Sequence, residues 1–386
     1  MIPYGRQEIT EADINAVVEV LRSDYLTQGP VVPAFEAAVA GYCQAAYAVA
    51  VNSATSALHL ACLAVGVGKG DRVWTSPISF VASANCALYC GATVDFVDID
   101  PATCNMSVER LSEKLMRAKT TASLPKAVIP VHLCGQPCDM KAIHALGQEY
   151  GFSIIEDASH AIGATYHGEP VGNCRYSDIT VFSFHPVKII TTGEGGMALT
   201  NDPKLAERMA LLRSHGITRD PARMTHEPDG PWYYQQIALG FNYRMTEIQA
   251  ALGISQLERL DGYVSRRQQL ADRYDALLAD FPVMVPGRSE SSRSSVHLYA
   301  IRLRLGQIGV SRHGVFSALR AQGIGVNLHY IPIHTQPYYQ AMDLDTAALA
   351  EAERYYASAI SLPLYPTLSD AEQEKIAACL RTALRG

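Results

Sequence analysis

Apolar residues in the first half of the chain form short runs, and segments of helical spacing separate them. Strands that are apolar on both faces and joined through helices are typical of a mostly parallel sheet covered on both sides. The pattern therefore predicts an α/β fold. The strands expected from it span residues 46–51, 72–75, 93–97, 127–131 and 152–155, with helices at 54–64, 81–89 and 140–150.

The pattern changes after residue 178. Strands are expected at 179–184 and 196–200, and the Gly-rich stretch between them leaves no room for a crossover helix. We therefore expect a large domain over residues 1–250, including an N-terminal arm, and a smaller α+β domain over 251–386. The later expected elements are helices at 203–213, 246–278, 312–322, 347–358 and 370–384, a strand at 297–303, a short strand near Val326 and a surface loop at 287–295.

The N-terminal arm contains one further expected helix. Thr10 precedes Glu11, and its hydroxyl is suited to cap the free amides of a helix that begins there. The apolar stripe expected on one face of this helix consists of Ile14, Val17, Val18 and Leu21.

Composition and charge narrow the class of protein. Of 386 residues, 48% are hydrophobic and 18% are charged, which excludes an intrinsically disordered chain. The net charge is −6, so nothing draws the chain to nucleic acid or to an anionic membrane. The N-terminus lacks a signal-peptide pattern, and no apolar run reaches the length of a membrane helix.

The cysteines predict a reducing compartment. There are nine, an odd number, and several lie in apolar stretches, so we expect buried free thiols and a cytoplasmic protein. Cys134 and Cys138 form a close pair but lack a second pair or a well-spaced histidine. They are interpreted as ordinary residues of a strand-end loop, and no metal site is expected.

Three segments at predicted strand ends carry candidate chemistry, because open α/β sheets bind ligands at the carboxyl ends of their strands. Asn52 to Leu58 runs through small residues into a helix, whose free N–H groups would attract a phosphate. Asp157 ends one apolar strand, and Lys188 follows another just before a Gly-rich connection. Taken singly, each segment also has an ordinary interpretation: residues 52–58 as a helix cap, Asp157 as a capping residue and Lys188 as a surface lysine.

Together the three segments meet the needs of pyridoxal phosphate. Lys188 lies 31 residues after Asp157. A desolvated lysine supplies a nucleophilic amine, and the carboxylate keeps the pyridine nitrogen of the cofactor protonated. The small residues at 52–58 would hold the phosphate, and Phe80 is placed to cover the ring.

These motifs, in this order, resemble the DegT/StrS family of nucleotide-sugar aminotransferases, which have the fold-type-I architecture of pyridoxal phosphate enzymes. The resemblance covers nearly the whole chain. It rests on residues 25–29, 52–58, 76–81, 156–160, 183–188, 240–245 and 328–334.

The resemblance implies roles for individual residues. Lys188 would bond the cofactor and move protons, and Asp157 would pair with the ring nitrogen. Asn242 would reach the phosphate from the neighbouring subunit, which implies a homodimer. Ala54 stands where the family often has glycine, but its N–H is still available. The implied cofactor contacts are Ser53, Ala54, Thr55, Phe80, Asp157, His160, Ser183, Lys188 and Asn242.

The resemblance also implies a reaction. L-glutamate would give its amino group to the cofactor, which passes it to a keto carbon of a nucleotide-linked sugar. Relatives with His in place of the lysine dehydrate C3 instead, so Lys188 favours transamination. The similar branch, in pseudaminic acid biosynthesis, aminates C4 of a UDP-linked 2-acetamido-2,6-dideoxy-4-keto-hexose. Its implied substrate contacts are Tyr4, Tyr25, Leu26, Thr27, Leu328, His329 and Tyr330.

Three alternatives remain open at this point. The acceptor could be a dTDP-linked keto sugar, or the protein could be a regulator that binds pyridoxal phosphate without turnover. A lyase or desulfurase on the same fold is disfavoured, because no cysteine has the context of a persulfide carrier.

Overall fold

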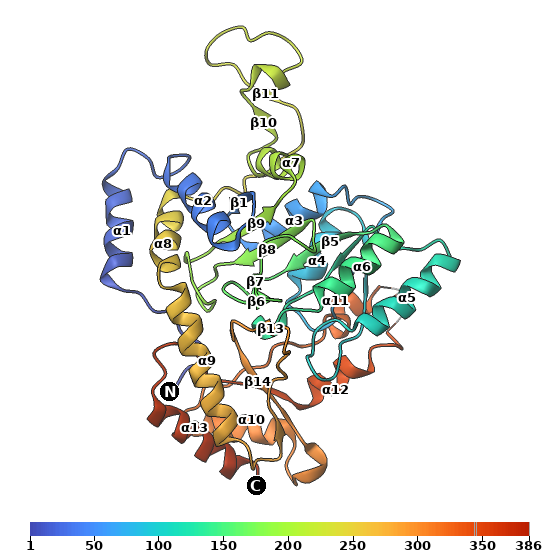
Figure 1. Ribbon diagram of the computed structural model, residues 1–386, viewed down its shortest axis with the longest axis vertical. Helices are drawn as coiled ribbons and strands as arrows, with labels where there is room; N and C mark the ends of the chain where they lie inside the picture. The colour runs from blue at the N-terminus through green and yellow to red at the C-terminus, as the bar shows by residue number, and fades with distance from the viewer. Residues whose placement is uncertain (343, 345, 386) are drawn as a thin grey trace.

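The computed structural model describes residues 1–342, 344 and 346–385 (Figure 1). Its main sheet has seven strands in the order β1-β9-β8-β5-β4-β2-β3. Strands β3, β2, β4, β5 and β8 run parallel, and β9 and β1 complete one edge by antiparallel pairing. The predicted mostly parallel α/β sheet is thus confirmed. Its strands are β1 (Tyr47–Val51), β2 (Arg72–Thr75), β3 (Thr93–Phe96), β4 (Ala127–Ile129), β5 (Ser153–Asp157), β8 (Ile179–Ser183) and β9 (Gly196–Thr200).

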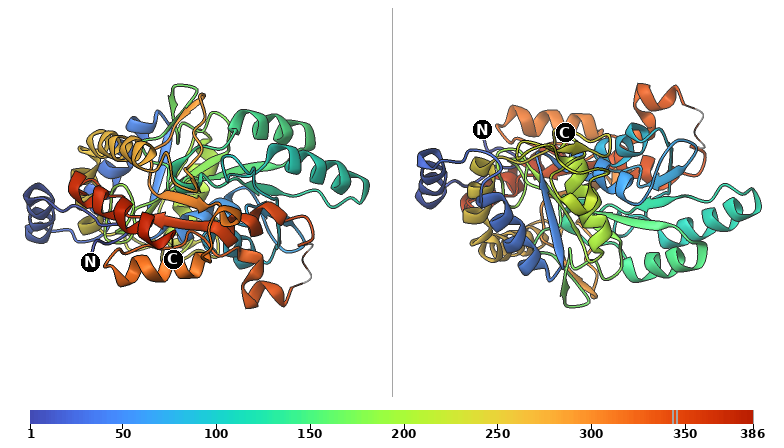
Figure 2. Two further views of the ribbon diagram at one scale, coloured as in Figure 1. Left: turned by 90° about the horizontal axis from the view of Figure 1, so that it is seen from below. Right: turned by 90° about the horizontal axis from the view of Figure 1, so that it is seen from above.

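Helices cover both faces of this sheet (Figure 2). Successive strand residues point to opposite faces. Val181 accordingly packs in the core with α3, α4 and α7, whereas Phe182 packs on the other side with α2 and α8. The main-sheet helices are α2 (Val31–Cys43), α3 (Ala54–Ala64), α4 (Ala82–Tyr89), α5 (Val108–Thr120), α6 (Met140–Tyr150), α7 (Pro203–Arg213) and α8 (Glu247–Leu257).

The C-terminal part has its own antiparallel sheet and its own apolar core. Ile2 joins this core, and its backbone pairs with Gly323 and Gly325 at 2.9 and 2.7 Å. The predicted division after residue 250 falls inside α8 and stays a prediction. The elements here are β12 (Val283–Met284), β14 (Tyr299–Leu303), β15 (Ala359–Leu362), α9 (Leu260–Leu277), α10 (Arg312–Ala321), α11 (Pro337–Gln340), α12 (Ala350–Ser358) and α13 (Asp370–Ala383).

Three expected elements differ from the structure. The long helix expected at 246–278 is interrupted, because Arg259 leaves the helical conformation between α8 and α9. The expected loop at 287–295 contains β13 (Ser292–Arg293), which pairs with β6 (Thr165–Tyr166), itself paired with β7 (Glu169–Pro170). The strand expected near Val326 is a single bridge between Asn327 and Ser361. The two strand pairings depend on partners far away in sequence, which local patterns do not contain.

The expected first helix is present as α1 (Glu11–Arg22), but its apolar stripe is only partly covered. Ile14 and Leu21 are 46% and 55% exposed, whereas Asp13 is buried. Asp13 binds Arg259, just after α8, at 2.6 Å and accepts a hydrogen bond from Gln256 of α8 at 3.0 Å, so polar contacts fix this helix against α8. Ile14 and Leu21 are thus left on the surface of the single chain, whereas Val20 is buried.

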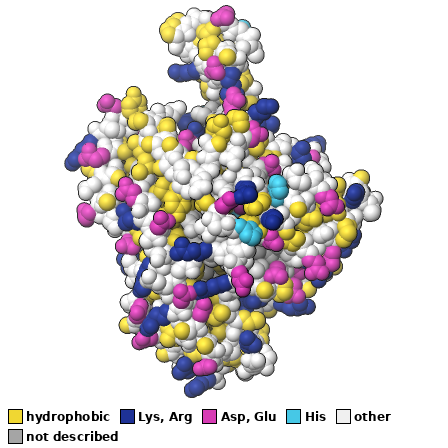
Figure 3. Space-filling view, viewed as in Figure 1, with side chains coloured by type: hydrophobic (Ala, Val, Ile, Leu, Met, Phe, Trp, Pro, Cys, Tyr) yellow, Lys and Arg dark blue, Asp and Glu magenta, His cyan; other side chains and the backbone are white. Residues whose placement is uncertain are grey.

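A slender segment projects from the body between α7 and α8 (Figures 1 and 3). It carries β10 (Ile217–Thr218) and β11 (Gln235–Gln236), and Trp232 and Leu239 on it are 69% and 83% exposed. Along the described part of the chain, no helix has the length and apolar character to cross a membrane. Among the residues that the structure describes there are also four short 3₁₀ helices: η1 (Leu133–Gly135), η2 (Pro221–Arg223), η3 (Leu305–Gln307) and η4 (Ile333–Thr335).

Candidate active site

A cavity of about 980 Å³ lies at the carboxyl ends of β5 and β8, with a wall from the C-terminal part. The structure thus brings most of the predicted site residues to one place. Those that line the cavity are Tyr4, Ser53, Ala54, Thr55, Phe80, Asp157, His160, Ser183, Lys188, Leu328, His329 and Tyr330.

Four predicted site residues do not line this cavity. Tyr25, Leu26 and Thr27 are exposed in the connection between α1 and α2. Asn242 is also exposed, and its carbonyl accepts a hydrogen bond from Asn52 Nδ2 of the same chain at 3.4 Å. Their predicted contacts with substrate or with a neighbouring subunit stay predictions.

The start of α3 forms an anion cradle. Ser53 caps the helix, and its Oγ accepts the Ser56 N–H at 3.2 Å. The N–H groups of Ala54 and Thr55 are the first two of the helix and have no acceptor within it. The helix dipole adds partial positive charge at the same point, so this end of the cavity favours an anionic group.

Gly196, at the start of β9, keeps the cradle in place. A Cβ at this position would lie 2.4 Å from the Ala54 nitrogen. We expect Gly196→Ala to lower the free energy of unfolding by about 1–3 kcal/mol, since backbone atoms must move apart. It should also weaken anion binding at α3. Urea unfolding and phosphate-competition titrations measure both effects. Gly41→Ala is the control, because no atom lies within 4 Å of its added Cβ. Equal stability of the two variants would contradict the expectation.

Asp157 supplies a buried carboxylate at the end of β5, with 4% of its surface exposed. It accepts hydrogen bonds from Ser83 Oγ at 2.6 Å and from the Ser159 N–H at 3.2 Å. These donors fix the position of the carboxylate, and Asp157 lines the cavity. Ser83, near the start of α4, was not predicted; its hydroxyl lies 2.6 Å from that of Ser79, in the turn before the helix.

Lys188 follows β8 and lines the same cavity. Burial lowers the pKa of its ammonium to about 8, and the nearby carboxylate of Asp157 offsets only part of that effect. About a tenth of Lys188 is therefore a neutral, nucleophilic amine at pH 7, far more than for a solvated lysine.

The lowered pKa of Lys188 predicts the pH profile of its labelling. A protonated amine does not react with acylating reagents, so the rate at Lys188 in the cofactor-free protein should rise with pH and reach half its maximum near pH 8. Solvated lysines reach half-maximum near their ordinary pKa of about 10.4. Competitive acylation with peptide mass spectrometry measures both. A profile at Lys188 that coincides with that of exposed Lys126 would contradict the lowered pKa.

A histidine pair lies beside these groups. The rings of His160 and His297 are 4.5 Å apart, and His297 lines the cavity although it was expected only as the start of a strand. The turn η1 holds the pair together: the His297 N–H donates to the Cys134 carbonyl at 2.9 Å, and the Ser295 N–H donates to that of Gly135 at 3.1 Å. No local pattern indicated His297, because its position depends on these hydrogen bonds to a segment far away in sequence.

The side chain of His329 is already occupied. Its Nδ1 lies 2.8 Å from Ser361 Oγ, and its Nε2 lies 3.4 Å from Asn327 Nδ2. Burial lowers the pKa of His329 to about 4, so the ring is neutral. It therefore contributes a wall of the cavity rather than a charge.

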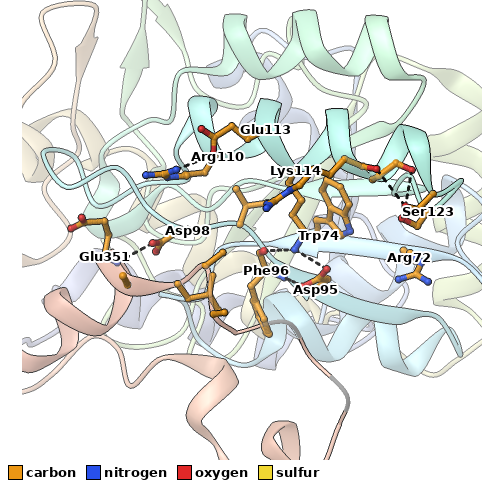
Figure 4. A pocket seen from close by; sticks show the side chains of 18 of the residues that line it. Arg72, Trp74, Asp95, Phe96, Asp98, Arg110, Glu113, Lys114, Ser123 and Glu351 are labelled. Atoms are coloured by element: carbon orange, nitrogen blue, oxygen red, sulfur yellow. Dashed lines mark hydrogen bonds and ion pairs between the residues drawn. The ribbon is translucent and has the colours of Figure 1, made fainter.

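A second cavity, of about 490 Å³, lies between β2, β3 and α5 and contains none of the predicted site residues (Figure 4). Its charges are largely paired inside the protein. Lys114 binds Asp95 at 2.7 Å, and Asp98 accepts the Glu351 N–H at 2.9 Å. Within the described ranges, no group of three or more His, Cys, Asp or Glu is arranged to hold a metal ion.

Comparison with known proteins accounts for this arrangement. The model of the DegT/DnrJ/EryC1/StrS aminotransferase family matches residues 7–381. The spore coat polysaccharide biosynthesis protein SpsC of Bacillus subtilis is 39% identical over 388 residues, covering 100% of this chain and 97% of SpsC.

Solved structures agree with this match. Helicobacter pylori PseC, an aminotransferase involved in pseudaminic acid biosynthesis, superimposes with a TM-score of 0.90, at 32% identity and 99% coverage of both chains. Spr1654 of Streptococcus pneumoniae, a candidate sugar aminotransferase solved in its pyridoxamine phosphate form, gives 0.89, at 31% identity and 99% coverage of both. The chain belongs to the DegT/DnrJ/EryC1/StrS aminotransferase family.

Proposed function

We propose that this sugar aminotransferase transfers the amino group of L-glutamate to C4 of a UDP-linked 2-acetamido-2,6-dideoxy-4-keto-hexose. One observation carries the proposal: the Lys188 amine, the buried Asp157 carboxylate and the amide cradle of α3 line a single cavity. The similarity to PseC supports the choice of sugar.

Pyridoxal phosphate is the cofactor of the family, and the residues of the cavity fit it. The N–H groups of Ala54 and Thr55, with Ser53 and Ser183 nearby, suit the phosphate. Asp157 suits a protonated ring nitrogen, and Phe80 and His160 flank the space for the ring. When bound, the cofactor supplies an electron sink for negative charge at the reacting carbon.

Lys188 has two tasks in this proposal. Its amine would bond the cofactor at rest, and once released it would carry a proton between carbon atoms as a general base and then as an acid. A pKa of about 8 suits both directions, because neither protonation state is strongly favoured near neutral pH.

We also propose that the enzyme is a cytoplasmic homodimer with shared active sites. Ile14 and Leu21 on α1 are exposed, as are Trp232 and Leu239 on the projecting segment, and such apolar side chains suit a subunit contact. Asn242 would then act on the neighbouring cavity. Light scattering of the purified protein tests the assembly, and a monomeric mass would contradict it.

A substrate panel tests the function. Release of 2-oxoglutarate from L-glutamate should require a keto sugar, and the UDP-linked 4-keto-hexose should be the fastest acceptor. Faster amination of a dTDP-linked keto sugar would favour the alternative acceptor. Cofactor absorbance without any 2-oxoglutarate release, even in a single turnover, would favour a non-catalytic regulator.

A further inference from the structure

A hydrogen-bond chain at the cavity wall has a single direction. The backbone N–H of Cys134 lies 3.2 Å from His160 Nδ1, and a backbone N–H only donates, so Nδ1 is the acceptor. Burial and the nearby Lys188 hold the pKa of His160 well below its usual range, so the ring is neutral. A neutral imidazole has one proton, and in His160 it is therefore on Nε2.

The next group in the chain is Tyr330. His160 Nε2 lies 3.0 Å from the Tyr330 hydroxyl, and because Nε2 carries the proton, the hydroxyl oxygen accepts. The hydroxyl's own proton has no acceptor among the described residues, and Tyr330 lines the cavity. Burial raises the pKa of the Tyr330 phenol, so it remains protonated. The chain thus presents one O–H donor to a ligand.

The ring of Tyr330 is held in this position from two sides. It stacks on His160 with an interplanar angle of 22°, and its centroid lies 6.3 Å from that of Phe80. Since His329 beside it has partners on both ring nitrogens, Tyr330 is the better placed of the two to donate to a substrate oxygen.

We propose that Tyr330 is the proton donor to the carbonyl oxygen that leaves the sugar carbon. The inference rests on the proposed function. When a carbonyl oxygen is exchanged for an amino nitrogen, the C=O bond is replaced by C=N and the oxygen departs as water, whose two protons come from the nitrogen. Tyr330 delivers one proton to the departing oxygen and recovers one that the nitrogen releases, so protons balance and no oxidant is needed.

Tyr330→Phe tests the proposal, since it keeps the ring and removes only the hydroxyl. The two half-reactions are followed separately by absorbance of the holoenzyme. Conversion with L-glutamate ends in the reverse exchange, in which water replaces the nitrogen on the carbon of 2-oxoglutarate, so it should slow as well. Amination of the keto sugar should slow by about 10²-fold in kcat, within the range of general acid catalysis, with KM changed less than threefold. Tyr338→Phe is the matched control, because the Tyr338 side chain is 65% exposed.

The direction of the hydrogen-bond chain can be measured without enzyme turnover. In ¹⁵N-histidine-labelled protein, the NMR spectrum should show His160 protonated at Nε2. Protonation at Nδ1, or less than fivefold slowing of sugar amination in Tyr330→Phe, would overturn the role of Tyr330. Failure of the wild-type enzyme to aminate any keto sugar would instead overturn the proposed function.

Discussion

Replacement of Lys188 by alanine is expected to reduce turnover by about 10⁴-fold or more. The variant loses the proton carrier, which alone is worth up to about 10⁴-fold, and it loses the nucleophile that bonds the cofactor. The fold should be unchanged, because Lys188 lies at the edge of an open cavity rather than in the core. Initial rates of 2-oxoglutarate release measure the loss. Borohydride reduction followed by peptide mapping should place the cofactor on Lys188 in the wild-type protein.

Lys188→Arg separates charge from chemistry. It keeps a cation near Asp157 but has no amine that exchanges its proton near neutral pH, so it should be as inactive as the alanine variant. Lys126→Ala, at an exposed position, should behave as wild type. Residual turnover within tenfold of wild type in Lys188→Ala would remove Lys188 from the mechanism.

Asp157→Asn is expected to have the second largest effect, a loss of about 10²–10³-fold in kcat. The amide has nearly the same shape, but it does not stabilise a positive charge on the ring nitrogen, so the cofactor withdraws electrons less strongly. The expected loss should appear in both half-reactions. Stopped-flow absorbance measures each half separately.

Ser83→Ala is the matched control for Asp157. It removes one hydrogen bond at 2.6 Å but leaves the carboxylate and its Ser159 N–H partner. We expect less than tenfold loss. If Ser83→Ala and Asp157→Asn lost activity equally, position rather than charge would explain the effect of Asp157.

The site at this sheet edge could be predicted because the end of each strand, and the residues at that end, are visible in the local pattern. Asp157 and Lys188 follow the neighbouring parallel strands β5 and β8. Strand β1 is antiparallel to β9, which is antiparallel to β8, so β1 also runs parallel to β8 and its end at Asn52 reaches the same edge. The parallel direction of β1, β5 and β8 therefore brings residues 52–58, Asp157 and Lys188 to one edge of the sheet.

Other features could not be predicted, because they depend on distant partners. The apolar stripe of α1 did not indicate that Ile14 and Leu21 are exposed, because the contact of Asp13 with the distant Arg259 is not part of the local pattern. His297 precedes β14, and its place at the cavity depends on the hydrogen bonds of residues 295 and 297 to η1. A periodic pattern predicts that one face of a helix is apolar, but it does not identify the residues that cover this face.

The turn η1 has a consequence for attempts to redesign the enzyme. Ser295 Oγ donates to the His160 carbonyl at 2.9 Å, and a Cβ on Gly135, whose φ is +92°, would lie 2.5 Å from the same Oγ. Walls from both halves of the chain are thus joined by their backbones here. Loop grafting in this region should disrupt both walls together, so libraries that aim at new sugar acceptors are better confined to side chains around the rim, such as Tyr4 and Leu328.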